Sequence, residues 1–158
     1  MRIIFVCLGN IVRSPLAENL FRHLAKEREV EDHYQVDSAG TSAYHVGETP
    51  DGRMRKVARE KGLFYSGEAR QFQLDDFYQF DLVIAMDQEN QQMLEKMADS
   101  PENRAKIRLL REFDPQANQE LDVPDPYYGG MDGFHHVYDL VERSLAGLLE
   151  YLENERSS

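Results

Sequence analysis

Short apolar runs alternate along this chain with longer segments in which apolar residues recur every three or four positions. The first and third runs are continuous, which is typical of strands buried on both faces of a parallel sheet. The predicted strands are residues 2–6, 34–38, 82–86 and 107–110. Helical spacing follows the first three, and apolar positions from Phe134 to Leu152 predict one long amphipathic helix. This alternation predicts an α/β domain with a parallel sheet and right-handed crossovers.

A few side chains predict where the helices begin and end. Ser14 stands before a proline, which combines a capping hydroxyl with a good first helical residue, so a helix is expected to begin there. A second helix is expected over residues 50–61, with Gly62 placed to end it. A third is expected to begin near Asp87, which caps it together with Asn90. Its buried face is predicted to include Met93, Leu94 and Met97.

The length of 158 residues predicts a single domain, which we assign to residues 1–155, with residues 156–158 as a disordered tail. The longest uninterrupted apolar run is Ile3–Leu8, far shorter than the roughly 18 residues of a membrane span. Because this run begins almost at Met1, no secretory leader precedes it. We therefore expect a cytoplasmic protein and leave open secretion without a signal peptide. The single cysteine excludes an intrachain disulfide and a cysteine-built zinc site.

The chain carries 18 basic and 29 acidic residues, a formal net charge of −11. Such a surface repels nucleic-acid phosphates and anionic lipid, so no nucleic-acid or membrane partner is expected. A small positive pocket is compatible with this charge, because local backbone dipoles outweigh a distant field. We interpret Asp114, Asp122 and the charges of residues 150–155 as solvated. Outside a pocket, the negative surface favours substrates with basic flanks.

The only cysteine lies at the end of the first predicted strand, in a C-x5-R-S pattern formed by Cys7, Arg13 and Ser14. Ligands bind beyond the carboxyl ends of strands in open α/β sheets, which is where this loop would lie. Five residues curling between Cys7 and Arg13 can direct their N–H groups at one tetrahedral anion, and the following helix adds its positive end. Gly9 and Asn10 tolerate the backbone conformations of such a loop. The alternative is a small buried cysteine beside an unrelated arginine.

This loop has the parts needed for attack on phosphorus. The positive field favours a thiolate at Cys7, which can displace an alcohol from a phosphate ester and form a thiophosphate intermediate. The planar fork of Arg13 suits two phosphoryl oxygens and the charge of the transition state. The Ser14 hydroxyl can donate to the sulfur and improve it as a leaving group in the second step.

A proton donor for the leaving oxygen is also required, and a carboxyl group can serve as acid and then as base. Asp125 lies between two prolines in the stretch 122–130, which predicts a stiff loop that holds its carboxyl group at fixed reach. Tyr127 and Tyr128 follow directly and would supply apolar walls for an aromatic phosphate ester. The alternative is a turn aspartate with two half-buried tyrosines.

At this point the chain resembles the low-molecular-weight protein tyrosine phosphatases over essentially its whole length. The matching blocks are Phe5–Ile11, Arg13–Pro15, Asp37–Thr41, His45–Gly47, Pro50–Asp51, Ala69–Gln71, Ala85–Asp87 with Asn90, and Asp125–Gly129. So many blocks in the same order make the resemblance highly specific. It implies a three-layer α/β/α fold with a four-stranded parallel sheet in the order 2-1-3-4 and a phosphate loop after strand 1.

The resemblance also implies a role for each matching residue. The family's nucleophile falls on Cys7, its phosphate-clasping arginine on Arg13 and its general acid on Asp125. The implied phosphate-binding residues are Leu8, Gly9, Asn10, Ile11, Val12 and Arg13. Loop support falls on Asn10, Ser14 and Ser38, and the substrate pocket on Ile11, Tyr44, Tyr127 and Tyr128.

The same resemblance implies catalysis without a metal or another cofactor. Its implied partners are phosphotyrosine-containing proteins, with a tyrosine kinase as one option. The protein itself is expected to be a monomer or a weak dimer.

The chain departs from the family at several positions. Val12 replaces a second cysteine that in relatives forms a reversible disulfide with the nucleophile, so oxidation of Cys7 is expected to become irreversible. Ile11 stands where related arginine phosphatases carry threonine, which favours a flat aromatic leaving group. Gly67 replaces a histidine of the supporting network, which water or another side chain must then complete. Tyr44 replaces a tryptophan common at the pocket rim of bacterial members.

Two further functions stay open beside tyrosine phosphatase activity. One is a pseudophosphatase that binds phosphotyrosine without turnover, and the other is a phosphatase for phosphoarginine or small-molecule monoesters. An arsenate reductase is excluded, because its disulfide relay needs further cysteines. The histidines have no predicted catalytic role: His45 is expected to pack or bond within its loop, and His135–His136 lack a ligand three or four residues further on.

Overall fold

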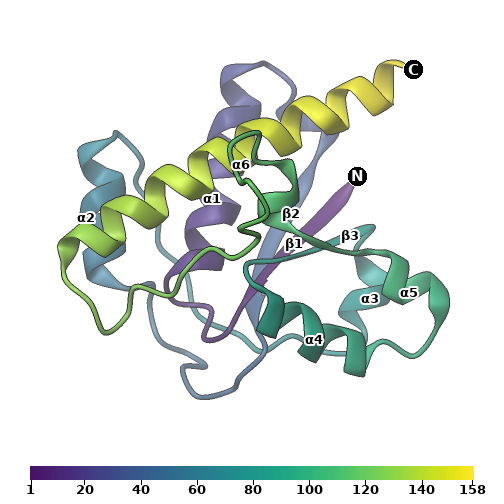
Figure 1. The fold of residues 1–158 in the computed structure, drawn as a ribbon, viewed down its shortest axis with the longest axis horizontal. Helices are drawn as coiled ribbons and strands as arrows, with labels where there is room; N and C mark the ends of the chain where they lie inside the picture. Colours follow the sequence, from purple (N-terminus) through teal and green to yellow (C-terminus); the bar gives the residue numbers. More distant parts are fainter.

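The computed structural model describes the whole chain, residues 1–158. Its centre is a sheet of four parallel strands, β1 (Arg2–Cys7), β2 (Gln35–Gly40), β3 (Leu82–Ala85) and β4 (Ile107–Leu109). They lie in the order β2-β1-β3-β4, which confirms the predicted parallel sheet and its order (Figure 1). The continuous apolar run forms β1, which lies between two other strands, and all of its residues from Ile3 to Cys7 are therefore buried.

Helices cover both faces of the sheet and produce three layers (Figure 1). One face is covered by α1 (Arg13–Glu27), α2 (Gly52–Glu60) and α6 (Met131–Ser157). The other is covered by α3 (Asp76–Gln79) and α4 (Gln88–Met97), with α5 (Pro101–Ala105) beside β4. Short 3-10 turns, η1 (Glu31–His33) and η2 (Leu110–Phe113), join the remaining segments. None of the helices combines the length and the apolar composition that crossing a membrane would require.

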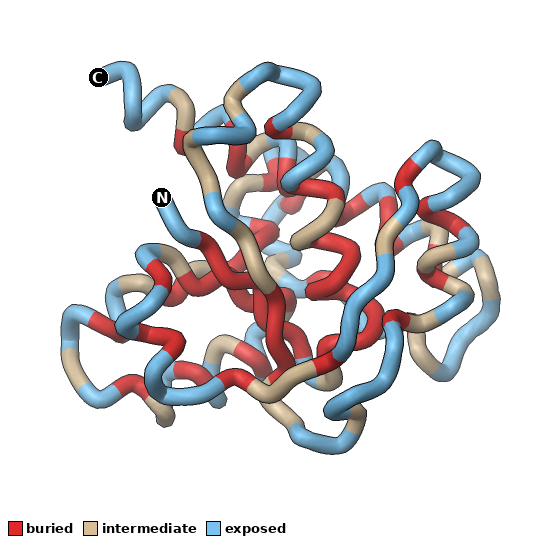
Figure 2. Tube along the Cα trace, turned by 180° about the vertical axis from the view of Figure 1, so that it is seen from behind, coloured by how far each residue is buried: buried red, intermediate tan, exposed pale blue.

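Side chains of β1 alternate between two hydrophobic cores, as the period of a strand requires. Ile3 and Phe5 pack into the larger core under α1 and α6. Ile4 and Val6 pack into the smaller core, which includes Phe77 of α3. Figure 2 shows the buried trace running through the middle of the molecule, with exposed residues around it. Both faces of β1 are therefore buried, and after its carboxyl end the chain reaches the surface at Leu8, which is 51% exposed.

Three helix details differ from the sequence prediction. Ser14 does not cap α1, which begins at Arg13 with Val12 at the N-cap position and no side-chain cap. The Ser14 hydroxyl lies within the first turn and contacts Cys7 instead. On α4, Met93 is 46% exposed, and Asn90 is buried on the inner face in its place. Where a disordered tail was expected from residue 156, α6 continues to Ser157.

Asp114 is not solvated, which corrects the sequence interpretation. Its side chain has no exposed surface and accepts from Arg143 at 2.7 and 2.9 Å and from Arg111 at 3.2 Å. Burial raises the pKa of Asp114, but the hydrogen bonds from Arg143, Gln116 and Arg111 outweigh burial and hold that pKa below its ordinary value. Glu153 is likewise mostly covered, because it accepts from His33 and Tyr34. Side chains of the protein, most of them distant in sequence, take the place of solvent around these two carboxylates.

Candidate active site

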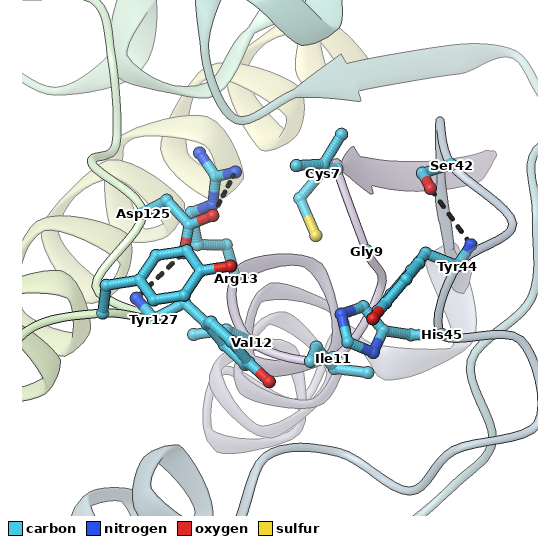
Figure 3. A pocket seen from close by; sticks show the side chains of 12 residues that line it. Cys7, Gly9, Ile11, Val12, Arg13, Ser42, Tyr44, His45, Asp125 and Tyr127 are labelled. Atoms are coloured by element: carbon cyan, nitrogen blue, oxygen red, sulfur yellow. Dashed lines mark hydrogen bonds and ion pairs between the residues drawn. The ribbon is translucent and has the colours of Figure 1, made fainter.

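The carboxyl end of β1 opens into a cavity of about 520 Å³ (Figure 3). The sequence placed its candidate residues around such a cavity, and the structure brings most of them together there. The lining residues are Cys7, Leu8, Gly9, Ile11, Val12, Arg13, Ser42, Tyr44, His45, Asp125, Tyr127 and Tyr128. Asn10, Ser14 and Ser38 lie behind this lining as buried polar side chains. Ser42 and His45 are additional lining residues that the sequence analysis did not include.

The loop of residues 8–12 leaves its backbone N–H groups without an acceptor in the protein, and Leu8, Gly9, Ile11 and Val12 line the cavity. The carbonyl oxygens of Cys7, Leu8 and Ile11 accept from amides of neighbouring segments at 2.7–2.9 Å, whereas no backbone acceptor of the protein engages an N–H group of residues 8–12. Asn10 has a φ of 57°, a left-handed conformation that its short polar side chain tolerates. A Cβ at Gly40 would lie 2.7 Å from the Leu8 carbonyl oxygen, so only glycine lets β2 pack this close to the loop. The loop has the form of an anion cradle.

A chain of hydrogen bonds behind the loop ends at the Cys7 sulfur. The Asn10 Nδ2 group donates to Ser14 Oγ at 2.8 Å and to Ser38 Oγ at 3.0 Å. Ser38 therefore uses its own hydrogen for Glu18 Oε1, at 2.6 Å. Ser14 Oγ lies 3.0 Å from Cys7 Sγ and, because it accepts from Asn10, keeps its hydrogen for the sulfur or for the Ala39 carbonyl oxygen, which is farther away at 3.4 Å. Glu18 sets the direction of the whole chain, because a carboxylate oxygen can only accept.

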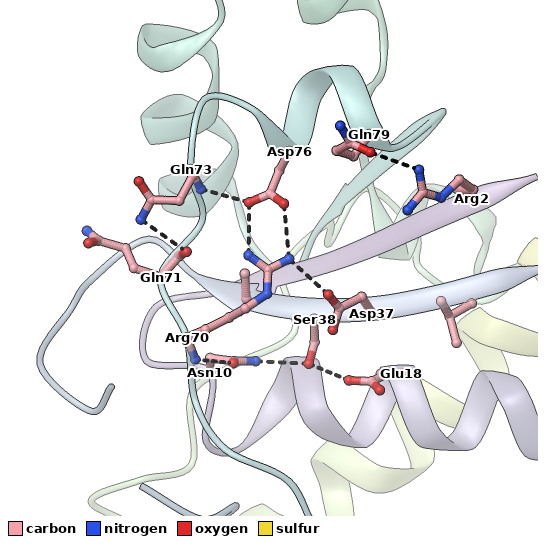
Figure 4. Close-up of polar contacts among 12 residues, drawn as sticks. Arg2, Asn10, Glu18, Asp37, Ser38, Arg70, Gln71, Gln73, Asp76 and Gln79 are labelled. Carbon is pink, nitrogen blue, oxygen red and sulfur yellow. Dashed lines mark hydrogen bonds and ion pairs between the residues drawn. The ribbon is translucent and has the colours of Figure 1, made fainter. Parts of the chain in front are cut away.

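Arg70 completes the hydrogen bonding of Asn10 (Figure 4). Its backbone N–H donates to Asn10 Oδ1 at 2.9 Å. Its guanidinium is held by Asp76 at 3.0 Å and by Asp37 at 2.9 Å, so the segment that supplies this N–H is anchored at both sides. Gly67 has a φ of 138°, which side-chain-bearing residues rarely adopt. The backbone N–H of Arg70 thus satisfies the Asn10 carbonyl oxygen, whereas the sequence predicts water or another side chain there.

Arg13 is 3% exposed and reaches the cavity from the first turn of α1. Its Nη1 group donates to Asp87 Oδ2 at 2.6 Å and to the Val123 carbonyl oxygen at 2.9 Å. Burial lowers the pKa of Arg13, but the charges of Cys7, Asp87 and Asp125 outweigh burial and raise it. The guanidinium is therefore charged and fixed in orientation before any substrate binds.

Asp87 has a role that the sequence analysis missed. The sequence indicated a helix cap, and Oδ1 does accept from the Asn90 amide at 2.8 Å, which confirms the cap. The second oxygen binds Arg13, 74 residues away in the chain. The available signal was its position two residues after β3, at the same edge of the sheet as the loop of residues 8–12.

The loop of Asp125 is tied to the sheet and to α2. The Val123 amide donates to the Met86 carbonyl oxygen at 2.8 Å, and Arg53 donates to the Tyr127 carbonyl oxygen at 2.9 Å. The Asp125 carboxyl group is 42% exposed, with Oδ2 3.7 Å from Arg13 and Oδ1 accepting from the Tyr127 amide at 3.1 Å. The predicted acid therefore lies beside the predicted phosphate-binding arginine, in contact with solvent.

Aromatic rings form the walls and rim of the cavity (Figure 3). The His45 ring lies between Tyr44 and Tyr127, with centroid distances of 4.8 and 5.8 Å. Its Nδ1 atom is 2.8 Å from Glu48 Oε2, which confirms the expected bond within its loop. Tyr44 is 84% exposed and Tyr128 96%, so both belong to the rim, whereas Ile11 is buried. Across the whole structure, no three His, Cys, Asp or Glu side chains are grouped so as to hold a metal ion.

Comparison with known proteins decides the family. The model of the family described as low molecular weight phosphotyrosine protein phosphatase matches residues 2–158. The chain belongs to this family. A curated relative from Streptomyces coelicolor, a low molecular weight protein-tyrosine-phosphatase, is 44% identical over 94% of this chain and 91% of its own length.

Solved structures agree with this membership in the low molecular weight phosphatases. The crystal structure of a protein tyrosine phosphatase from Entamoeba histolytica, with Hepes in its active site, has a TM-score of 0.94. It is 38% identical, covering 99% of both chains. A Drosophila arginine phosphatase has a TM-score of 0.89 and 35% identity, covering 96% of this chain and 98% of its own. The family thus includes enzymes named for two kinds of phosphorylated residue, and the fold alone does not choose between them.

Proposed function

We propose that this protein hydrolyses phosphotyrosine monoesters by way of a cysteinyl-phosphate intermediate. The observation that carries the proposal is the convergence on one cavity of the Cys7 sulfur, the free N–H groups of residues 8–12, the charged Arg13 and the carboxyl group of Asp125. Each is a group that displacement at phosphorus requires, and they come from two separate parts of the chain, residues 7–13 and the loop of Asp125.

In the first step, the Cys7 thiolate attacks phosphorus and the bond from phosphorus to the tyrosyl oxygen breaks. Asp125 donates its proton to that oxygen, so tyrosine leaves as a neutral phenol. The loop amides and Arg13 bind the three equatorial oxygens, whose charge is largest in the transition state. Arg13 needs no reorientation, because Asp87 and the Val123 carbonyl already hold it.

In the second step, Asp125 accepts a proton from water, whose oxygen attacks phosphorus. The sulfur–phosphorus bond breaks, inorganic phosphate forms and the Cys7 thiolate is restored. The Ser14 hydroxyl, directed at the sulfur by the Asn10 network, stabilises the departing thiolate. The carboxyl group of Asp125 ends the cycle protonated, ready for the next ester.

The walls support an aromatic leaving group. Buried Ile11 and the Tyr127 ring offer apolar surface to a flat phenyl group, and Tyr44 and Tyr128 extend that surface at the rim. A guanidinium leaving group would instead need a hydrogen-bond acceptor, which Ile11 does not supply. We therefore propose phosphotyrosine-containing proteins as substrates. A cytoplasmic location and a monomeric or weakly dimeric state stay predictions.

The test is steady-state hydrolysis of para-nitrophenyl phosphate, phosphotyrosine and phosphoarginine in the presence of EDTA, for the parent and for Cys7→Ser. We expect the parent to turn over the first two, to resist chelation and to prefer phosphotyrosine to phosphoarginine, and the variant to be inactive. Faster turnover of phosphoarginine would assign the protein to the arginine phosphatases. Phosphotyrosine binding without turnover by the parent would make it a pseudophosphatase.

A further inference from the structure

Positive charge is concentrated on one helix of this acidic protein. Residues 53–61 contain five of the 18 basic residues and a single acidic one, whereas the whole chain has a net charge of −11. These residues span α2 and the residue after it. Because Met54, Val57 and Ala58 face the core, the charged side chains between them face outward.

Four of these cations lack a carboxylate partner. Lys56, Arg59 and Lys61 are exposed and Arg55 is half-buried, and no carboxylate oxygen lies within 4.0 Å of their charged nitrogens. Arg55 donates only to the Pro50 carbonyl oxygen, at 3.1 Å. We call Arg55, Lys56 and Arg59, which lie within about 100° of one another around the helix, the basic face of α2. Lys61, the residue after α2, lies instead over the Tyr138 ring of α6, 6.0 Å from its centroid. The cations of the basic face can bind an anionic partner without first breaking an ion pair, whereas the paired arginines of the chain would have to break one.

The helix that carries the basic face, α2, begins beside the walls of the catalytic cavity. Asp51, which caps α2, donates its amide to the Ile11 carbonyl oxygen at 2.7 Å, and Arg53 donates to the Tyr127 carbonyl oxygen at 2.9 Å. From there α2 leads away along the edge of the molecule, beside the first turns of α6 (Figure 1). A helical rise of 1.5 Å per residue puts Arg59 about 12 Å further along than Asp51. An extended peptide covers that distance with about four residues.

We propose that the basic face of α2 binds acidic residues of the phosphoprotein substrate. The inference rests on the proposed function, because it assumes a phosphorylated side chain in the cavity. Preferred substrates would carry Asp or Glu roughly three to six residues from the phosphotyrosine, on the side of the peptide that runs along α2. This reverses the basic-flank expectation drawn from net charge. The screening length is about 8 Å at physiological salt, so a bound peptide responds to the charges within that distance more than to the net charge of the whole chain.

The experiment compares two variants of equal net charge. K56Q/R59Q removes two cations of the basic face, and K96Q/R104Q removes two exposed cations on α4 and α5, across the sheet. Substrates are para-nitrophenyl phosphate and phosphotyrosine peptides flanked by Glu or by Lys on either side, each at low and high salt. Binding of the same peptides is measured in a Cys7→Ser background by fluorescence anisotropy, which does not depend on turnover.

We expect the parent to favour a Glu-flanked peptide, and K56Q/R59Q to lower kcat/KM and affinity for it about fivefold, mainly at low salt. K96Q/R104Q should leave this preference intact, and both variants should hydrolyse para-nitrophenyl phosphate like the parent. The proposal would be overturned if both variants lost kcat/KM for the Glu-flanked peptide equally. It would also be overturned if the parent favoured Lys-flanked peptides or showed no preference between the two flanks. Association of the face with anionic lipid vesicles without any peptide preference would also overturn it. If the parent binds Glu-flanked peptides selectively but hydrolyses no phosphate ester, the proposed role of the basic face is supported and the proposed phosphatase function is refuted.

Discussion

Asp87→Asn isolates the contact that holds Arg13. In the parent, Asp87 Oδ2 accepts from Arg13 Nη1 at 2.6 Å, and Oδ1 caps α4 through the Asn90 amide. Asparagine has the same shape and caps helices as well as aspartate does, so Oδ1 keeps the cap. The second oxygen becomes an NH2 group, which presents a donor to a donor and removes the negative charge. The change therefore acts on Arg13 and leaves α4 in place.

The magnitude follows from the contacts that remain. A hydrogen bond to a charged group is worth about 1.5–3 kcal/mol, and each 1.4 kcal/mol is a factor of ten. Arg13 keeps the Val123 carbonyl oxygen and the nearby Asp125, so its side chain stays in the cavity but gains freedom. We expect kcat/KM for para-nitrophenyl phosphate to fall about 10- to 100-fold. Inhibition by inorganic phosphate should weaken in parallel, since Arg13 is expected to bind both the inhibitor and the phosphoryl group of the substrate.

The assay needs a control at the same helix start. Asp122 Oδ1 accepts from the Gln88 amide at 2.8 Å, and this exposed carboxylate has no contact with Arg13. Asp122→Asn should therefore keep kcat/KM within about twofold of the parent value. Thermal unfolding of both variants checks that α4 is intact. If the two variants lose activity equally, or Asp87→Asn loses none, Asp87 is only a helix cap and the reasoning about Arg13 is wrong.

Three further outcomes are expected. Asp125→Asn should slow hydrolysis of phenyl phosphate about 10²- to 10⁴-fold and of para-nitrophenyl phosphate less, because only the poorer leaving group needs the proton; equal losses would remove Asp125 as the acid. Peroxide should inactivate the parent with little recovery by thiol, whereas Val12→Cys should recover, since a second thiol can trap oxidised Cys7; full recovery of the parent would contradict this. Asp114→Asn should lower the free energy of unfolding by about 3–5 kcal/mol in urea at neutral pH. Since the folded-state pKa of Asp114 is depressed, its contribution is complete above the unfolded-state pKa of about 4 and is lost as pH falls through the folded-state pKa, a step the variant should lack.

The elements of the fold could be predicted because their signals are local. A strand buried on both faces must be apolar at consecutive positions, and the run after Arg2 satisfies this in β1. The period of apolar residues from Phe134 to Leu152 identifies α6 for the same reason. The ends of helices are harder to predict from local signals. Ser14 is a residue type that often caps helices, but its hydroxyl contacts the Cys7 sulfur and α1 begins one residue earlier.

The sequence by itself determined the α/β class and the loop between Cys7 and Arg13, since backbone periodicity and short loop spacing are properties of neighbouring residues. It also marked Asp125 through its proline-flanked motif, but not its place beside Arg13. The tertiary structure decided which polar groups meet. Asp87 pairs with a residue 74 positions away, Arg70 with one 60 positions away and Asp114 with one 29 positions away. Hydrogen bonds and buried ion pairs act over a few ångströms, so whether a carboxylate is solvated, structural or part of the site depends on what the folded sheet brings beside it.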